Sequence, residues 1–178
     1  MGRIIAVANQ KGGVGKSTTA INLSACLAEK GKKVLAIDID PQGNTTSGLG
    51  VDKNTVENTL YELLLGQADA KSTIVKNVVE NLDLIPSNVN LSGAEIELIG
   101  VDDKEYILKR ITDKIRRKYY YIIMDCPPSL NMLTINALTA ATSVLVPIQC
   151  EYYALEGLSQ LIHTIDLVKE RLNKRLVM

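Results

Sequence analysis

The stretch Gln10-Lys11-Gly12-Gly13-Val14-Gly15-Lys16-Ser17-Thr18 decides how this chain folds. It follows an apolar run at 4–8, typical of a buried strand, and precedes an apolar-periodic segment at 20–28, typical of a helix. A glycine-rich loop between a strand and a helix can turn its backbone N–H groups toward an oxyanion, because no Cβ atom intervenes. The positive end of the helix dipole points to the same place. The stretch therefore predicts a phosphate-binding loop that holds a nucleoside triphosphate.

The side chains of this loop have distinct expected roles. Lys16 is expected to place its charge on the β- and γ-phosphates, and the Ser17 hydroxyl to bind Mg²⁺. Gln10 stands where the common pattern G-x-x-x-x-G-K-[ST] has a glycine, and a second lysine, Lys11, opens the loop. Lys11 is either a solvated lysine on a turn or a lysine with a function of its own. The expected nucleotide-binding residues are Lys11, Gly12, Gly13, Val14, Gly15, Lys16, Ser17 and Thr18.

Length and composition limit the alternatives. At 178 residues, the chain (1–178) is expected to form a single domain with a substantial core. Twenty basic and twenty acidic residues cancel, so any DNA contact must come from a local patch. Cys26, Cys126 and Cys150 are far apart and no secretory segment precedes them, which predicts reduced, buried thiols in the cytoplasm. No apolar run reaches the roughly 18 residues that span a bilayer, so no stable membrane insertion is expected.

Apolar runs alternate with helical patterns along the chain. This alternation predicts an α/β fold with a doubly wound, mostly parallel sheet, helices on both faces and ligands at the carboxyl ends of the strands. The last residues, 175–178, look like the opening of a further strand, which predicts that the natural protein continues. The other predicted strands are 34–37, 81–86, 119–124 and 143–148; the other predicted helices are 55–65, 103–118, 131–141 and 154–172, with a loop from 43 to 50.

Three aspartates follow predicted strands. Asp125 ends the β-rich run 121–124, and an aspartate at this place holds Mg²⁺ directly or through water when a phosphate loop is present. Asp38 and Asp40 end the second strand. The sequence Asp40-Pro41-Gln42-Gly43 is also typical of a simple turn, and Asp38 is equally interpreted as a brace for that loop.

Four motifs in fixed order resemble the ParA/Soj family of chromosome-partitioning ATPases, in the ParA/MinD superfamily with its deviant Walker A loop. They are K-G-G-V-G-K-S-T-T at 11–19, D-I-D-P-Q-G-N at 38–44, I-I-M-D-C-P-P-S-L at 122–130 and V-P-I-Q-C-E-Y-Y-A-L-E-G-L at 146–158. The resemblance covers essentially the whole chain and implies a P-loop NTPase fold. Members of the family run longer, which implies that the C-terminal part is lacking here.

The resemblance implies a weak ATPase that uses Mg²⁺ and converts ATP and water to ADP and phosphate. Lys11 would reach across a homodimer interface to the partner's nucleotide, Lys16 would hold the bound ATP, and Asp40 would orient the attacking water, so these three are the expected catalytic residues. The ATP-bound dimer would bind DNA non-specifically at the nucleoid, in the cytoplasm. A ParB/Spo0J-like protein would stimulate hydrolysis, and the protein would partition a chromosome or plasmid and regulate replication initiation or sporulation.

Two other branches of the superfamily remain as alternatives: a MinD-like membrane-associated positioning ATPase and an iron–sulfur carrier ATPase. The adenine pocket and the key DNA-contacting arginines of the family would lie beyond Met178. A basic cluster near the end of the 103–118 segment is interpreted either as a solvated face or as a DNA contact. Its members are Lys109, Arg110, Lys114, Arg116, Arg117 and Lys118.

Overall fold

A computed structural model describes residues 2–149 and 154–178. In this part of the chain, six strands form one sheet in the order β3-β4-β2-β5-β1-β6, and only the β3–β4 pair is antiparallel. The prediction of a mostly parallel α/β sheet is therefore confirmed. The strands are β1 (Arg3–Val7), β2 (Val34–Asp38), β3 (Val75–Val79), β4 (Leu82–Ile85), β5 (Tyr121–Asp125) and β6 (Ser143–Leu145).

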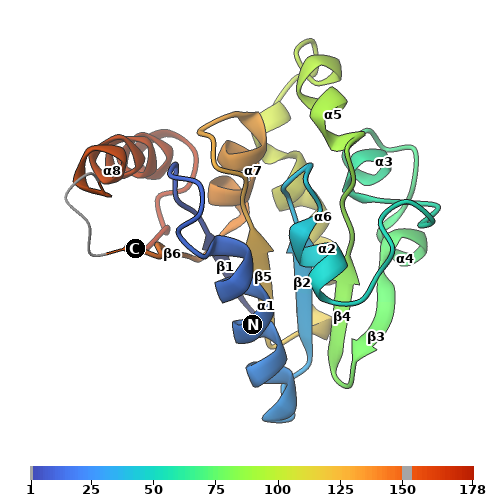
Figure 1. The fold of residues 1–178 in the computed structure, drawn as a ribbon. Helices are drawn as coiled ribbons and strands as arrows, with labels where there is room; N and C mark the ends of the chain where they lie inside the picture. Colours follow the sequence, from blue (N-terminus) through green and yellow to red (C-terminus); the bar gives the residue numbers. More distant parts are fainter. Residues whose placement is uncertain (1, 150–153) are drawn as a thin grey trace.

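Helices cover both faces of this sheet (Figure 1). Strand β2 shows why, because its side chains alternate: Val34 and Ala36 pack in the cluster that contains α1, whereas Leu35 and Ile37 pack in the cluster that contains α6 and α7. The helices are α1 (Lys16–Glu29), α2 (Asn44–Gly48), α3 (Leu60–Leu64), α4 (Ala70–Thr73), α5 (Leu91–Glu97), α6 (Ile107–Ile115), α7 (Met132–Ala140) and α8 (Ala154–Arg171), with 3₁₀ turns η1 (Lys104–Tyr106) and η2 (Arg116–Lys118).

Several predicted boundaries were wrong. The helix expected over 55–65 is only α3, because Thr59 and Glu62 form a capping box that starts the helix at Leu60. The expected loop 43–50 contains α2, and the expected helix 103–118 consists of η1, α6 and η2 in succession. The strand expected over 143–148 ends at Leu145, two residues before Pro147, which has no N–H for a ladder bond.

Sequence reasoning also missed β3, α4 and α5. Strand β3 carries polar residues on an edge of the sheet and contains Asn77 at a positive φ of 51°, so it lacks the continuous apolar signal of the parallel strands. Val177 forms an isolated parallel bridge with Ser143, consistent with the strand-like pattern expected at 175–178. Cys126 is buried as expected, but Cys26 is exposed on α1, and Cys150 lies outside the described residues.

Candidate functional site

The loop between β1 and α1 adopts a conformation that requires glycine. Gly13 and Gly15 have φ values of 73° and 87°, in the left-handed region that residues with a Cβ atom rarely adopt. Gly15 is also the N-cap of α1, so the first N–H groups of this helix point toward the loop. The backbone thus has the form of an anion-binding loop at a helix N-terminus.

Side chains outside the glycine pattern hold the loop in place. The Asn9 carboxamide oxygen accepts a hydrogen bond from the backbone N–H of Lys11 at 3.0 Å, and its Nδ2 donates to the Pro147 carbonyl oxygen at 2.8 Å. Gln149 Nε2 donates to the Gly13 carbonyl oxygen at 3.1 Å. The segment after β6 therefore supports the loop, which sequence analysis did not predict because Asn9 and Pro147 are 138 residues apart.

Lys16 extends back over the loop. Its side chain is largely buried and its Nζ donates to the Lys11 carbonyl oxygen at 3.0 Å. Burial lowers the pKa of Lys16, whereas the negative charges of Asp125 and Asp40 act to raise it. A partly desolvated ammonium group inside an N–H-lined loop suits a phosphate oxygen, since charge-assisted hydrogen bonds are strongest where water is excluded.

The three aspartates singled out in the sequence meet at one edge of the sheet. Asp38 and Asp125 are opposite each other in the β2–β5 register, and the Ile39 N–H donates to the Asp125 carbonyl oxygen at 2.9 Å. Asp40 lies two residues beyond Asp38, and its N–H donates to Asp38 Oδ1 at 3.2 Å. The carboxyl ends of β1, β2 and β5 thus bring the phosphate loop and these carboxylates together.

Asp125 has the properties of a metal ligand. Its side chain is buried, Oδ2 accepts a hydrogen bond from Thr45 Oγ1 at 2.7 Å, and Oδ1 has no hydrogen-bond partner among the described residues. Burial raises the pKa of Asp125, and interactions with Ser17 and Thr45 oppose that rise. The Ser17 hydroxyl and the Asp125 carboxylate are hard oxygen groups, the kind of ligand that Mg²⁺ prefers.

The metal-binding groups would be completed by phosphate. The described residues contain no group of three His, Cys, Asp or Glu side chains that could hold a metal ion by themselves. Mg²⁺ commonly binds through one or two protein ligands together with substrate phosphates and water. The hydroxyl of Ser17 and the open oxygen of Asp125 fit this mode of binding.

A closed ring of hydrogen bonds fixes the backbone around Asp40. Asp38 Oδ2 accepts from the Thr46 N–H at 2.8 Å and from Thr46 Oγ1 at 2.7 Å, while Thr46 Oγ1 accepts from the Ser87 N–H at 2.9 Å. Ser87 Oγ donates to the Asp40 carbonyl oxygen at 2.8 Å. The backbone N–H and carbonyl oxygen of Asp40 are therefore both hydrogen-bonded within this ring. Because the backbone is held in this way, the position from which the Asp40 carboxylate extends is fixed.

The ring also alters the ionisation of its central acid. Burial raises the pKa of Asp38 to about 7, with the nearby negative charge of Asp125 adding to that rise and the Thr46 hydrogen bonds opposing it. Sequence analysis left Asp38 either as a residue that only caps or braces the loop or as a functional residue, and its hydrogen bonds with Thr46 and Asp40 are those of a brace. Thr45, Thr46 and Ser87 were not singled out, because the contacts between Thr45 and Asp125 and between Thr46 and Ser87 join residues 80 and 41 positions apart.

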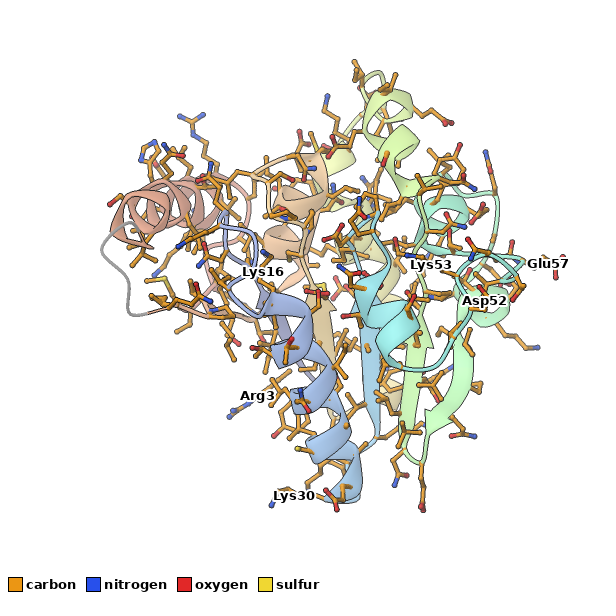
Figure 2. The ribbon with its side chains drawn as sticks, in the orientation of Figure 1. Arg3, Lys16, Lys30, Asp52, Lys53 and Glu57 are labelled. Carbon is orange, nitrogen blue, oxygen red and sulfur yellow. The ribbon has the colours of Figure 1, made fainter. Side chains whose placement is uncertain are left out.

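A pocket of about 360 Å³ lies between the loop and the segment that contains Asp40. Asp40 lines it, and Oδ1 of this residue accepts the Gln42 N–H at 2.9 Å. Figure 2 shows Lys16 at the start of α1, beside the loop. The lining residues are Gly12, Gly13, Gly15, Lys16, Ser17, Thr18, Asp40, Gln42, Asn44 and Pro128.

Comparison with known proteins shows the family of the chain. A family model described as AAA domain matches residues 2–178. The chain is 58% identical over 177 residues to the sporulation initiation inhibitor protein Soj of Bacillus subtilis, covering 99% of this chain and 70% of that protein. The chain belongs to the ParA/Soj family. It is also 52% identical over 178 residues to the chromosome partitioning protein ParA of Myxococcus xanthus, covering 100% of this chain and 63% of that protein.

Solved structures of ParA/Soj-like fold show the same architecture. A cobyrinic acid a,c-diamide synthase from Mycobacterium smegmatis, solved with bound ATP analog and magnesium, has a TM-score of 0.95 and 43% identity over 99% of this chain and 72% of that one. A plasmid partition protein from Borrelia burgdorferi has a TM-score of 0.85 and 36% identity, over 99% of this chain and 76% of that one. The P-loop NTPase fold expected from the sequence is confirmed.

Two further expectations concern membranes and the basic cluster. None of the described helices is long and apolar enough to cross a membrane. In the cluster, Lys109 and Arg116 both form ion pairs with Asp113, and Arg110 Nη2 donates to the Asp103 carbonyl oxygen at 2.7 Å. Part of the cluster thus stabilises its own segment, and none of its members lines the pocket beside the phosphate loop.

Proposed function

We propose that this ParA/Soj-family protein is a weak Mg²⁺-dependent ATPase that converts ATP and water to ADP and phosphate. The observation that carries the proposal is the convergence of Lys16, Ser17, Asp40 and Asp125 around one glycine loop at the carboxyl ends of three strands. The family, and a relative solved with an ATP analog and magnesium, support ATP and Mg²⁺ as the ligands.

In this proposal the protein positions charges rather than forming covalent bonds. The loop N–H groups and Lys16 bind the phosphates, and Ser17 and Asp125 would hold Mg²⁺, which neutralises charge on the phosphate oxygens. Asp40 accepts a hydrogen bond from the attacking water and keeps it in line with the γ-phosphate. Because the hydrogen-bonded ring already fixes the backbone of Asp40, little reorganisation is needed to reach that geometry.

We further propose that two ATP-bound subunits form a sandwich dimer in which Lys11 contacts the partner's nucleotide. This dimer binds DNA at the nucleoid, and a ParB-like protein stimulates hydrolysis and so releases the DNA. The names of the relatives support chromosome partitioning, with a link to sporulation in the Bacillus subtilis protein. The chain spans 63–70% of the length of these two relatives, so these assembly steps concern the whole protein.

Replacement of Asp40 tests the proposed reaction. Asp40→Ala should bind ATP with near wild-type affinity in a calorimetric titration, because the loop and Lys16 are intact, but should release phosphate at least roughly tenfold more slowly. Asp52→Ala is the matched control, since Asp52 caps an exposed turn outside the pocket. Normal phosphate release by Asp40→Ala would remove this carboxylate from the mechanism, and equal losses in both variants would indicate a general structural effect.

A further inference from the structure

A lysine outside the nucleotide pocket contacts the segment that carries Asp40. Lys53 follows α2 in the chain, and its Nζ donates to the Gln42 carbonyl oxygen at 2.5 Å. Sequence analysis did not single out Lys53, because it belongs to none of the four motifs. Gln42 lines the pocket and Lys53 does not, so the lysine reaches this segment from outside the pocket. Figure 2 shows Lys16 and Lys53 on opposite sides of β2 in this view.

The methylene chain of Lys53 packs against the backbone at Gly43. Gly43 has a φ of 64°, in the left-handed region, and a Cβ atom there would lie 2.8 Å from Lys53 Cδ and 2.9 Å from the Ser87 carbonyl oxygen. The glycine therefore leaves room for the lysine side chain to lie directly over the turn. Lys53 thus contacts two adjacent residues, Gln42 through its ammonium group and Gly43 through its methylene chain.

Main-chain hydrogen bonds anchor the segment that carries Lys53. The Val51 N–H donates to the Thr46 carbonyl oxygen at 3.2 Å, which connects the segment to α2. The Thr55 N–H donates to the Asp52 carbonyl oxygen at 3.1 Å, which closes a turn around the lysine. Neither bond involves the side chain of Asp52 or Thr55, so a substitution such as Asp52→Ala keeps both bonds and leaves Lys53 in place.

The ammonium group of Lys53 is directed at a carbonyl oxygen rather than at an acid. Lys53 is half-buried, and it forms no ion pair with any residue that the structure describes. A hydrogen bond from a charged donor is roughly twice as strong as a bond between neutral groups. The charge of Lys53 therefore serves to hold one peptide unit of the Asp40 segment.

That peptide unit joins Gln42 to Gly43 and is hydrogen-bonded at both of its ends. Its carbonyl oxygen accepts from Lys53, and its N–H, which belongs to Gly43, donates to the Asp40 carbonyl oxygen at 2.9 Å. The preceding N–H, which belongs to Gln42, donates to Asp40 Oδ1 at 2.9 Å. Rotation of the unit would break its bonds to Lys53 and to the Asp40 backbone together. The same rotation would displace the Gln42 N–H that holds the Asp40 carboxylate.

We propose that Lys53 is a positioning residue for ATP hydrolysis, because it holds the Gln42–Gly43 peptide unit in the orientation that fixes the Asp40 carboxylate. The inference rests on the proposed function, in which Asp40 orients the attacking water. Lys53 lies outside the pocket, so its effect on the reaction passes through Asp40. Since a misplacement of about 1 Å can cost about 100-fold in rate, a loosened Asp40 should slow hydrolysis while nucleotide affinity is kept.

Replacing the ammonium group in the whole protein tests this role. Lys53→Met keeps an apolar side chain over Gly43 but removes the charge, whereas Lys53→Arg keeps a charged donor. We expect Lys53→Met to lower kcat roughly fivefold to twentyfold, with the KM for ATP and the affinity for ADP near wild type, and Lys53→Arg to recover most of the rate. Lys71→Met, which neutralises an exposed lysine on α4, is the control and should match wild type.

A double-mutant cycle shows whether Lys53 acts through Asp40. In an Asp40→Ala protein, Lys53→Met should slow phosphate release no further, because the carboxylate that it positions is gone. The same fold-loss in both backgrounds would overturn the inference, as would a wild-type rate in Lys53→Met. A raised KM for ATP in Lys53→Met would also overturn it, because the lysine would then contact the nucleotide directly.

Amide hydrogen exchange without nucleotide separates this inference from the proposed function. The Gln42 and Gly43 N–H groups should exchange roughly threefold or more faster in Lys53→Met than in wild type or Lys71→Met. Unchanged exchange overturns the positioning role, whatever the ATPase activity. Normal phosphate release by Asp40→Ala contradicts the proposed function and with it the role of Lys53 in hydrolysis, while the exchange rates still decide whether Lys53 holds the turn.

Discussion

At the scale of single residues, Lys16 shows how position rather than residue type determines function. The chain has 20 basic residues, but Lys16 is largely buried, lies at the start of a helix and points into a loop lined by backbone N–H groups. Burial lowers the pKa of Lys16, and the negative charges of the nearby Asp125 and Asp40 oppose that fall. The charge of Lys16 therefore lies close to both acids and to the loop. A phosphate in the pocket would give this charge a much stronger partner than the Lys11 carbonyl oxygen does.

Replacing Lys16 should therefore weaken the binding of every nucleotide that carries a β-phosphate. In a calorimetric titration, we expect Lys16→Ala to lose roughly 1.5–3 kcal/mol of binding free energy for both ADP and ATP, which is the usual contribution of a charge-assisted hydrogen bond. Lys71→Ala, an exposed lysine on α4, serves as the control. Unchanged affinity of Lys16→Ala for both nucleotides would contradict the phosphate-loop assignment.

At the scale of elements, the short helix α2 links the two acidic strand ends. Thr45 donates to Asp125 on β5, while Thr46 donates to Asp38 on β2 and accepts from Ser87 after β4. Gly48 lets α2 lie close to α1, since a Cβ atom there would come within 2.4 Å of Ile21 Cδ1. A displacement of α2 would therefore change the surroundings of Asp40 and Asp125 together.

Removing the Thr46 hydroxyl should disturb this link without touching the loop. Thr46→Val keeps the shape but leaves Asp38 Oδ2 and the Ser87 N–H each short of a buried partner, which should lower the free energy of unfolding by about 1–3 kcal/mol. We also expect phosphate release to slow while ADP affinity stays near wild type. Denaturant unfolding and calorimetry would measure both effects, with Thr55→Val in the exposed 52–55 turn as the control. If Thr46→Val is less stable but releases phosphate at the wild-type rate, the ring is not needed to position Asp40.

At the scale of the whole molecule, a second polar network stabilises the end of the sheet opposite the nucleotide pocket. Asp83 is buried and accepts hydrogen bonds from Lys33, Lys76, the Asn77 N–H and Tyr119. Burial alone would raise the pKa of Asp83, but these donors outweigh it and lower the pKa to about 2. Stability from this group is present above about pH 4, the unfolded value, and is lost as pH falls toward 2.

Two adjacent tyrosines allow a matched test of that network. Tyr119→Phe removes the hydroxyl that donates to Asp83 at 2.8 Å inside the protein, and we expect the free energy of unfolding at pH 7 to fall by about 1–2 kcal/mol. Tyr120→Phe changes the same group on an exposed side chain and should have almost no effect. Urea unfolding of both variants would measure the difference. Equal stability of the two variants would show that the Tyr119 hydroxyl contributes no net stability.

Assembly also belongs to this scale, and Lys11 is the residue that tests it. If Lys11 contacts the partner's phosphates in the proposed dimer, Lys11→Ala should keep monomeric ATP binding but lose roughly 1.5–3 kcal/mol of dimerisation free energy, a factor of ten or more. Sedimentation of the whole protein with a non-hydrolysable ATP analogue would measure this, with Lys71→Ala as the control. A Lys11→Ala dimer as tight as wild type would show that Lys11 acts only within its own loop.

The sequence by itself determined the phosphate loop, the parallel α/β architecture and the placement of acids at strand ends. These features follow from local patterns: glycines at fixed spacing around Lys16, and apolar strand runs that end in Asp38 and Asp125. The fold and the loop could be predicted because each of these patterns is contained in a stretch of about 20 consecutive residues. Their agreement with the observed β1–loop–α1 unit reflects steric rules that act between near neighbours.

Only the tertiary structure decided which distant side chains complete the site. Asn9 contacts Pro147, Thr46 contacts Ser87 and Thr45 contacts Asp125 across 41 to 138 residues, and no local pattern encodes such pairs. The antiparallel β3 and the short helices escaped prediction because packing on the sheet, rather than propensity, stabilises them.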